Sequence, residues 1–311
     1  MRESTAEQTL LAPAVPAGGR GRGWRGESQA LAVGRRLLRH RKGTIGAISL
    51  LLLAVVAIAS PLVAPYDPNE QHLLDQLAPP SSTYWFGTDE LGRDVLSRVI
   101  YGARPALQAG FSAVILAAVI GTLTGVVAGY LGGWVDSVVM RAWDTLLAFP
   151  AIFLAIGIVT ILGPGWANAV LAIAIINMPV FSRVVRATTL SAKERDFTEA
   201  ARAIGCTQWR IIRSHLLPTC VVPAIVLMAI AIPEAILVEA SLSFLGLGSQ
   251  PPNPSWGNML SSAQGYLARS ATYALFPGLA IVYTVLAMGF FADGLQDAID
   301  PRRGRSSGKG G

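Results

Sequence analysis

The stretch Glu199-Ala-Ala-Arg-Ala-Ile-Gly-Cys-Thr-Gln-Trp-Arg-Ile-Ile-Arg-Ser-His-Leu-Leu-Pro218 is a charged, amphipathic interruption in an otherwise apolar second half of the chain. Its pattern predicts a short helix, a turn at Gly205, and a second short helix that runs into an apolar segment. Asp196 and Glu199 lie near the start of the first helix, where the helix dipole favours anions. Thr207 is placed to cap the second helix. The stretch is therefore predicted to be a polar elbow between two apolar helices.

The composition around this elbow is that of a membrane protein. Of the 311 residues, 52% are hydrophobic and 14% are charged, whereas charged residues make up about a quarter of an ordinary globular chain. Several uncharged runs reach the roughly 20 residues that a helix needs to cross a bilayer core of about 30 Å. The fold class predicted is an all-α integral membrane protein.

The basic residues are distributed unevenly along the chain. Of the 25 Lys and Arg residues, nine lie in residues 1–42, seven in 183–213 and four in 302–309. Because short cytoplasmic loops carry the excess of Lys and Arg, both termini and the loop 183–215 are predicted to be cytoplasmic. Attraction to anionic membrane lipid accounts for the basic excess, so no nucleic-acid partner is expected.

Six transmembrane helices are predicted, at about 45–63, 106–131, 138–162, 167–182, 217–238 and 274–291. The third and fourth come from 38 consecutive uncharged residues, 145–182, which Gly163-Pro164-Gly165 divides, since neither proline nor glycine continues a helix comfortably. An alternative for the first apolar run is a cleaved signal peptide with Ala57-Ile58-Ala59 as its cleavage site. The uncharged run 43–66 is long for that interpretation.

The domain division follows from these spans. We expect a disordered cytoplasmic tail at 1–33, an N-terminal anchor with the first transmembrane helix at 34–66, an extracytoplasmic segment at 67–104, a five-helix core at 105–297 that contains the loop 183–215, and a cytoplasmic tail at 298–311. Within the second span, Gly121, Gly125 and Gly129 recur every four residues and predict close packing of helices. The alternative is that glycine is simply frequent in membrane helices.

The predicted extracytoplasmic segment is rich in charges. Its apolar periodicity indicates an amphipathic helix lying on the surface, with Leu91, Val95, Leu96 and Val99 on one face. Three arginines on the outer side run against the charge rule, and local pairing is expected to neutralise them. The acidic partners are Asp89, Glu90 and Asp94, and the arginines are Arg93, Arg98 and Arg104.

Two carboxylates and a tryptophan are the candidates for the translocation path. Glu234 and Glu239 lie in the fifth span, where a carboxylate is costly and is expected to face a wet cavity or a partner in the bundle. The alternative places Glu239 in water at the interface. Trp256 follows a proline-rich outer loop, and its alternative role is an anchor at the lipid headgroups.

Three motifs carry a resemblance to a known family. Glu199-Ala200-Ala201, Gly205 and Leu217-Pro218 resemble the EAA loop of ABC importer permeases, with His215 standing where isoleucine is usual. The stretches 87–104 and 251–260 resemble the C-type permease subunit of dipeptide, oligopeptide and nickel importers. Together the motifs extend the resemblance over residues 34–303. If this resemblance is set aside, the alternative interpretation of the elbow is a solvated interfacial helix between two spans.

The resemblance implies a type I ABC importer permease fold of six helices in a bacterial inner membrane. It implies a homologous second permease subunit, two ATP-binding subunits, an extracytoplasmic substrate-binding protein and surrounding lipid as partners. The residues expected to couple the chain to the ATPase are Glu199, Ala200, Ala201, Arg202, Gly205, Arg210, Leu217 and Pro218. The cargo implied is a dipeptide or oligopeptide, with nickel and other small solutes as alternatives.

The sequence holds no motif for catalysis. It has no phosphate-binding G-x-x-x-x-G-K-[ST] loop and no H-E-x-x-H zinc motif, and its two cysteines form no disulfide framework. No catalytic residue, cofactor or metal site is therefore expected. Two other classes stay open: a proton-driven carrier that uses Glu234 and Glu239, and a membrane scaffold without a transport role.

Overall fold

The computed structural model describes residues 34, 35, 37 and 41–299. The tail predicted at 1–33 and most of the tail predicted at 298–311 lie outside the described residues. Within them the secondary structure is helical, apart from one isolated bridge between Thr88 and Asp94.

The helices begin and end as follows: α2 Arg41–Ile58, α3 Ser60–Val63, α4 Val95–Leu131, α5 Gly133–Leu147, α6 Ala151–Leu162, α7 Trp166–Lys193, α8 Asp196–Ala203, α9 Gln208–Ile211, α10 Leu217–Phe244, α11 Trp256–Ala263 and α12 Ala271–Ile299. Three single turns accompany them: η1 Leu73–Asp75, the π-helical turn η2 Ile212–Leu216, and η3 Gln264–Tyr266.

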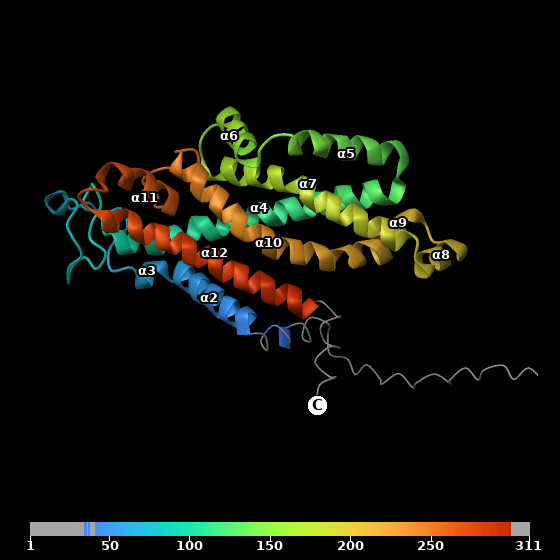
Figure 1. Cartoon of the computed structure of the whole chain (residues 1–311), viewed down its shortest axis with the longest axis horizontal. Coiled ribbons are helices and arrows are strands. Elements are labelled where there is room, and N and C mark those ends of the chain that lie inside the picture. Colours follow the sequence, from blue (N-terminus) through green and yellow to red (C-terminus); the bar gives the residue numbers. More distant parts are fainter. Residues whose placement is uncertain (1–33, 36, 38–40, 300–311) are drawn as a thin grey trace, which may run out of the picture.

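The five long helices α2, α4, α7, α10 and α12 run along the long axis of the molecule and pack against one another (Figure 1). The short helices α8 and α9 lie at one end of this bundle, whereas α3, α11 and the segment between α3 and α4 lie at the other (Figure 1). The bundle therefore separates two polar ends by its apolar length.

The long helices have the length and hydropathy of membrane spans. Five qualify among the described residues, and α5 with α6 make a sixth if they are counted as one bent span. The prediction of a single third helix over 138–162 was wrong, because the chain bends by 93° between α5 and α6. Pro150 stands at this break, where it has no N–H to donate and disfavours a helical conformation in Phe149.

A further prediction was wrong, because the amphipathic surface helix does not exist as a separate element. Val95, Leu96 and Val99 form the first turns of α4, which continues without a break to Leu131, and Leu91 lies in the turn that precedes it. The helix that contains the predicted fourth span continues beyond residue 182, to Lys193. Arg183 and Arg186 therefore lie on this helix, where they pair with Asp144 and Asp136 of α5 at 2.5 Å.

The glycine repeat of the second span lies against α7. A Cβ added to Gly121 would lie 2.5 Å from Cβ of Phe181, and one added to Gly125 would lie 2.5 Å from the carbonyl oxygen of Ser182. A Cβ added to Gly129 would lie 2.9 Å from Cβ of Thr189. Close helix packing is thus confirmed as the role of this repeat, since small residues let two backbones approach where no water drives association.

A second glycine contact joins α2 to α12. Gly43 and Gly294 face each other, so that a Cβ on Gly43 would lie 3.0 Å from Cα of Gly294. One turn further along, Gly46 lies against the backbone of Phe291. The N-terminal anchor helix therefore packs on the last helix of the core.

Candidate functional site

The polar elbow predicted around Gly205 comprises residues 194–216, which include α8, α9 and η2. It projects from the end of the bundle opposite α3 and α11 (Figure 1). Asp196 and Glu199 occupy the first turn of α8, where the helix dipole stabilises their negative charge. The predicted order of helix, turn and helix is confirmed.

The turn between α8 and α9 is closed by backbone hydrogen bonds. Gly205 has φ of 77°, a left-handed conformation that glycine adopts without strain. Its N–H donates to the Arg202 carbonyl at 3.0 Å, and the N–H of Cys206 donates to the Ala201 carbonyl at 3.0 Å, the pattern of a Schellman motif. Thr207 then caps α9 by accepting from the N–H of Arg210 at 3.4 Å. The roles predicted for Gly205 and Thr207 are confirmed.

The inner face of α8 is fixed to the rest of the chain. The buried hydroxyl of Thr198 donates to the Ala192 carbonyl of α7 at 2.9 Å. Ala201 is buried in a small apolar cluster with Ile211 and Leu216. The structure thus places Ala201 inside the protein itself, so that of the predicted alanine pair Ala200 faces outward.

The end of α4 also contacts the elbow. Lys193 donates through Nζ to the Tyr130 carbonyl at 2.8 Å. The charged groups of Lys193 and Arg202 lie 5.7 and 5.8 Å from the centre of the Tyr130 ring, close enough for cation–π attraction. α8 is therefore in contact with both α4 and α7.

The outer face of the elbow combines charges with exposed apolar side chains. Glu199, Ala200, Arg202 and Arg210 are all exposed. Ile204 is 80% exposed and Trp209 is 68% exposed. Ile204 and Trp209 were not among the predicted site residues, although a large apolar residue on each side of a turn glycine is a readable signal. Such an exposed group of apolar side chains with a polar rim is typical of a protein-binding surface.

The elbow continues directly into the fifth long helix. From Gln208 to Phe244 the chain is helical, with η2 inserted between α9 and α10. π-helical turns are frequent at functional sites. Leu217 is half-buried and Pro218 is exposed in the first turn of α10, where proline is tolerated. The unusual His215 stacks on Phe197 of α8, with ring centroids 6.1 Å apart, and so holds the two sides of the elbow together.

The two carboxylates of α10 have different surroundings. Glu234 is exposed. Glu239 is 1% exposed and accepts a hydrogen bond of 2.7 Å from the hydroxyl of Ser243. Ser243 in turn accepts from the N–H of Ser249 at 3.0 Å. The alternative that placed Glu239 in water is wrong, because this carboxyl group lies inside the bundle. The hydroxyl of Ser243, to which it is bonded, ties α10 to the loop that follows.

Trp256, the third candidate for the path, is 2% exposed. Its indole N–H donates to the Val99 carbonyl at 2.9 Å, and its ring fills the space beside Gly102, where a Cβ would lie 2.8 Å from Cδ1. The alternative of a headgroup anchor is wrong, because the protein covers this ring. Trp256 fastens α11 to the first turns of α4.

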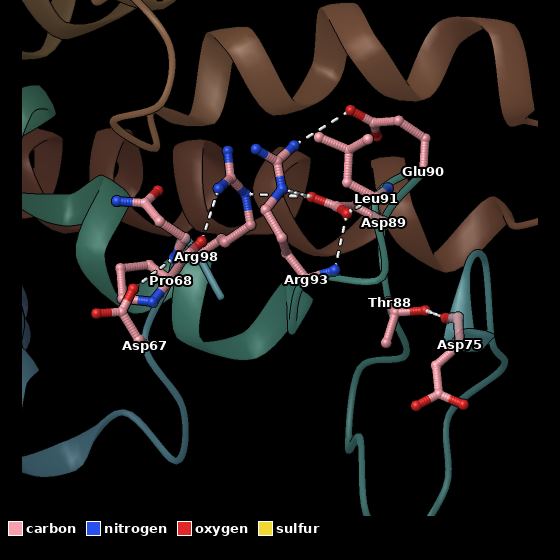
Figure 2. Close-up of polar contacts among 10 residues, drawn as sticks. Asp67, Pro68, Asp75, Thr88, Asp89, Glu90, Leu91, Arg93 and Arg98 are labelled. Carbon is pink, nitrogen blue, oxygen red and sulfur yellow. Dashed lines mark hydrogen bonds and ion pairs between the residues drawn. The ribbon is translucent and has the colours of Figure 1, made fainter. Parts of the chain in front are cut away.

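The segment between α3 and α4 is held by a buried ion-pair cluster (Figure 2). Asp89 is fully buried and lies 2.6 Å from Nε of Arg93 and 3.5 Å from Nε of Arg98. Arg93 also contacts Glu90 at 3.2 Å, and Arg98 donates to the Pro68 carbonyl at 2.7 Å (Figure 2). The predicted pairing of Asp89 and Glu90 with arginines is confirmed, and Arg98 fixes the segment at Pro68 against α4.

The other two members of the predicted cluster act differently. Asp94 caps α4 by accepting from the N–H of Ser97 at 2.8 Å. Arg104 donates to the carbonyls of Ala57 and Ile58 at 2.6 and 3.0 Å, where the end of α2 leaves carbonyls without a helical partner. The prediction that Asp94 pairs with an arginine and Arg104 with an acidic residue was therefore wrong.

A buried tyrosine adds a further hydrogen bond within the segment between α3 and α4. Tyr84 donates through its hydroxyl to Asp75 at 3.0 Å, and burial, with this hydrogen bond, raises the pKa of Tyr84 above its ordinary value. The phenol therefore remains a protonated donor at neutral pH.

The cysteines and acidic residues form no further centre. Cys206 and Cys220 are both free thiols, and Cys220 is buried with its sulfur 3.4 Å from the hydroxyl of Thr189. In the part of the chain that the structure describes, no three His, Cys, Asp or Glu side chains come together as a metal site.

A bundle of long apolar helices with a polar elbow at one end defines a multi-pass helical membrane protein. The chain belongs to the family of binding-protein-dependent transport system inner membrane components, whose model matches residues 121–305. The N-terminal transmembrane domain of oligopeptide transport permease C matches residues 28–80. Subunits of this family are non-catalytic permeases of ABC importers, in which partner subunits bind and hydrolyse ATP and a substrate-binding protein delivers the cargo.

Several characterised relatives are similar over most of their length. The dipeptide transport system permease protein DppC of Alkalihalophilus pseudofirmus is 43% identical, over 86% of this chain and 88% of the relative. The glutathione transport system permease protein GsiD is 44% identical in Pectobacterium atrosepticum and 46% identical in Escherichia coli, in both cases over 86% of this chain and 89% of the relative.

A solved structure agrees on the fold. A chain of the MetNI methionine ABC transporter in an inward-facing conformation superposes with a TM-score of 0.52 at 20% identity, over 65% of this chain and 97% of that chain. The type I ABC importer permease fold expected from the sequence is confirmed.

Proposed function

We propose that this chain is a permease subunit of an ATP-driven importer for dipeptides or oligopeptides, with the elbow and both termini in the cytoplasm. Relatives named for dipeptide and glutathione transport support peptides as the cargo. Nickel or another small solute is the alternative cargo. The basic residues of the elbow support its cytoplasmic position.

The observation that carries this proposal is the elbow's combination of an exposed outer face and a fastened inner face. Exposed Glu199 and Trp209 offer a charge and an apolar surface to an ATP-binding subunit. Thr198 and Ala201 join α8 to α7 and to η2, the turn that leads into α10. ATP-driven closure of the partner subunits then moves α7 and α10 together, which is how rigid-body motion produces alternating access.

The break between α5 and α6 supports a second permease as partner. Non-helical backbone at membrane depth is tolerated only where protein or a water-filled cavity covers it. Phe149, Pro150 and Phe153 at this break are all exposed. We infer that a homologous second subunit covers the break in a heterodimer and that lipid covers exposed apolar side chains such as Leu51 and Leu62 of the N-terminal anchor.

The substitution Glu199→Lys tests the coupling role. We expect it to abolish peptide uptake in cells that express the complete importer, because it reverses the charge offered to the ATP-binding subunit, while the amount of permease in the membrane stays unchanged. Glu194→Lys is the matched control, since Glu194 is also exposed in the elbow but lies outside α8. Normal uptake in Glu199→Lys would remove the coupling role.

A proton-driven carrier is the second candidate, because Glu239 is a carboxyl group buried in the bundle. The two functions make opposite demands. An importer co-purifies with an ATP-hydrolysing subunit and stops when ATP is depleted, whereas a carrier stops when a protonophore collapses the proton gradient and ATP is kept constant. Uptake that survives ATP depletion would favour the carrier.

A further inference from the structure

The end of the bundle opposite the elbow contains an open cavity of about 500 Å³. Its walls come from the segment after α3, the first turns of α4, the start of α7 and the loop that follows α10. The volume lies in the range of pockets that hold small molecules. The cavity lies well away from the coupling residues, and neither Glu234, Glu239 nor Trp256 lines it.

Four carboxamide side chains distinguish the lining of this cavity, namely Asn69, Gln108, Gln250 and Asn253. A carboxamide both donates and accepts hydrogen bonds, and so matches the N–H and C=O groups of a peptide backbone regardless of the peptide's sequence. Gln250 uses its amide nitrogen on the carbonyls of Gly246 and Gly248, at 2.9 and 3.0 Å. That bonding fixes the side chain and leaves its oxygen as an acceptor.

One acid and one base also line the cavity. Asp67 is exposed and accepts the N–H of Asn69 at 2.7 Å through one oxygen, which leaves the other oxygen for an ammonium group. Arg104 holds the end of α2 through two of its nitrogens, and its guanidinium has further donors. A free peptide carries an ammonium group at one end and a carboxylate at the other. The charged side chains are therefore of the two kinds that complement the ends of a peptide.

Hydrogen bonds to the rest of the chain fix part of the cavity wall. Arg98 clamps the Pro68 carbonyl beside Asp67, and the Ser249 carbonyl accepts from the side-chain amide of Asn258 in α11. Trp166 is fixed by the hydrogen bond of 3.2 Å that its indole N–H donates to the Pro105 carbonyl. The backbone at Pro68 and Ser249 and the ring of Trp166 are thus held in place before any ligand arrives.

We propose that this cavity is a transfer site that holds a short peptide by its backbone and its charged ends after the binding protein releases it. The proposal rests on the proposed function, since it names where the cargo of that importer is first held by this chain. It assigns Gln108 and Asn253 to the peptide backbone and Asp67 to the terminal ammonium group.

The test uses the complete transporter in lipid vesicles, with its binding protein and radiolabelled dialanine outside. Uptake and ATP hydrolysis are measured together for the double variant Gln108→Leu/Asn253→Leu. We expect uptake to fall about tenfold while hydrolysis stimulated by the loaded binding protein stays at the wild-type level, so that more ATP is used for each peptide. Asp67→Asn, which keeps the acceptor for Asn69, is expected to lower uptake about threefold in the same manner.

Two matched controls accompany these variants. Gln264→Leu replaces an exposed glutamine at the same end of the bundle, in η3, and Glu70→Gln neutralises an exposed carboxylate close to Asp67; neither residue lines the cavity. Both controls are expected to transport normally.

The outcomes separate the two proposals. Wild-type vesicles that take up no dialanine, tripeptide or glutathione would overturn the proposed function. Wild-type uptake with unchanged uptake in the cavity variants would overturn the transfer site alone. Uptake and hydrolysis that fall together would also overturn it, because the cavity would then belong to the surface on which the binding protein docks.

Discussion

Gly205 closes α8 with φ of 77°, and a Cβ there would meet no atom within 4 Å. The substitution Gly205→Ala therefore acts through the backbone alone, at a cost of roughly 1–2 kcal/mol for a left-handed L-residue. We expect the hydrogen bonds from Gly205 and Cys206 to the end of α8 to open about tenfold more often. Hydrogen exchange of the peptide 201–210, followed by mass spectrometry, measures this change.

Gly157 provides the control at the same scale. It is also free of neighbours within 4 Å, but it lies in α6 without a positive φ. Alanine is a better helix former than glycine by about 1 kcal/mol, so Gly157→Ala is expected to leave exchange in the elbow unchanged. Equal loss of protection in both variants would show that the conformation of Gly205 is not what holds the turn.

Which single residues could be predicted depends on how far away their partners lie. The roles of Gly205 and Thr207 follow from backbone rules that act within four residues, and Asp89 finds Arg93 four positions away. Arg104, in contrast, binds the Ala57 carbonyl across 47 positions, and the burial of Trp256 depends on Gly102. Charge pattern alone does not encode such tertiary partners.

At the scale of helices, the contact of α4 with α7 depends on the absence of side chains at the glycine repeat. Gly125→Ala would place a Cβ 2.5 Å from the Ser182 carbonyl oxygen, and overpacking of this kind costs about 1–3 kcal/mol. We expect a lower midpoint in thermal unfolding of the purified complex. The control Gly289→Ala, in α12 with no neighbour within 4 Å, is expected to leave the midpoint unchanged, and a shift of equal size there would refute the packing role.

The existence of the helices could be predicted, but their ends and bends could not. Hydropathy located every long apolar helix, because each spans about the thickness of a bilayer. It failed where a helix leaves the apolar layer: α7 extends to Lys193 because Arg183 and Arg186 find Asp144 and Asp136 on α5. It also failed at the 93° bend, because hydropathy does not register Pro150, the helix-breaking residue inside this uncharged run.

The helices of the described residues differ in how many of their side chains the chain itself buries. The helices α4, α7 and α10 share a core of small buried residues, whereas α5 has no buried residue and α6 buries Ala155 and Val159. Because exposed non-helical backbone at Phe149 and Pro150 is costly in lipid, we expect the second permease subunit to lie across this break.

Disulfide crosslinking tests that arrangement in the assembled transporter. With the two free cysteines, Cys206 and Cys220, replaced by alanine, Phe149→Cys is paired in turn with cysteines placed along each helix of the partner permease, and an oxidant is added. We expect a covalent permease heterodimer from at least one pair, because Phe149 is 56% exposed and lies at the break that we propose the partner covers. Leu51→Cys is the control, since Leu51 is 65% exposed on α2 and is expected to face lipid. Crosslinking from Leu51 and none from Phe149 would place the partner on the N-terminal anchor and leave the break to a water-filled cavity.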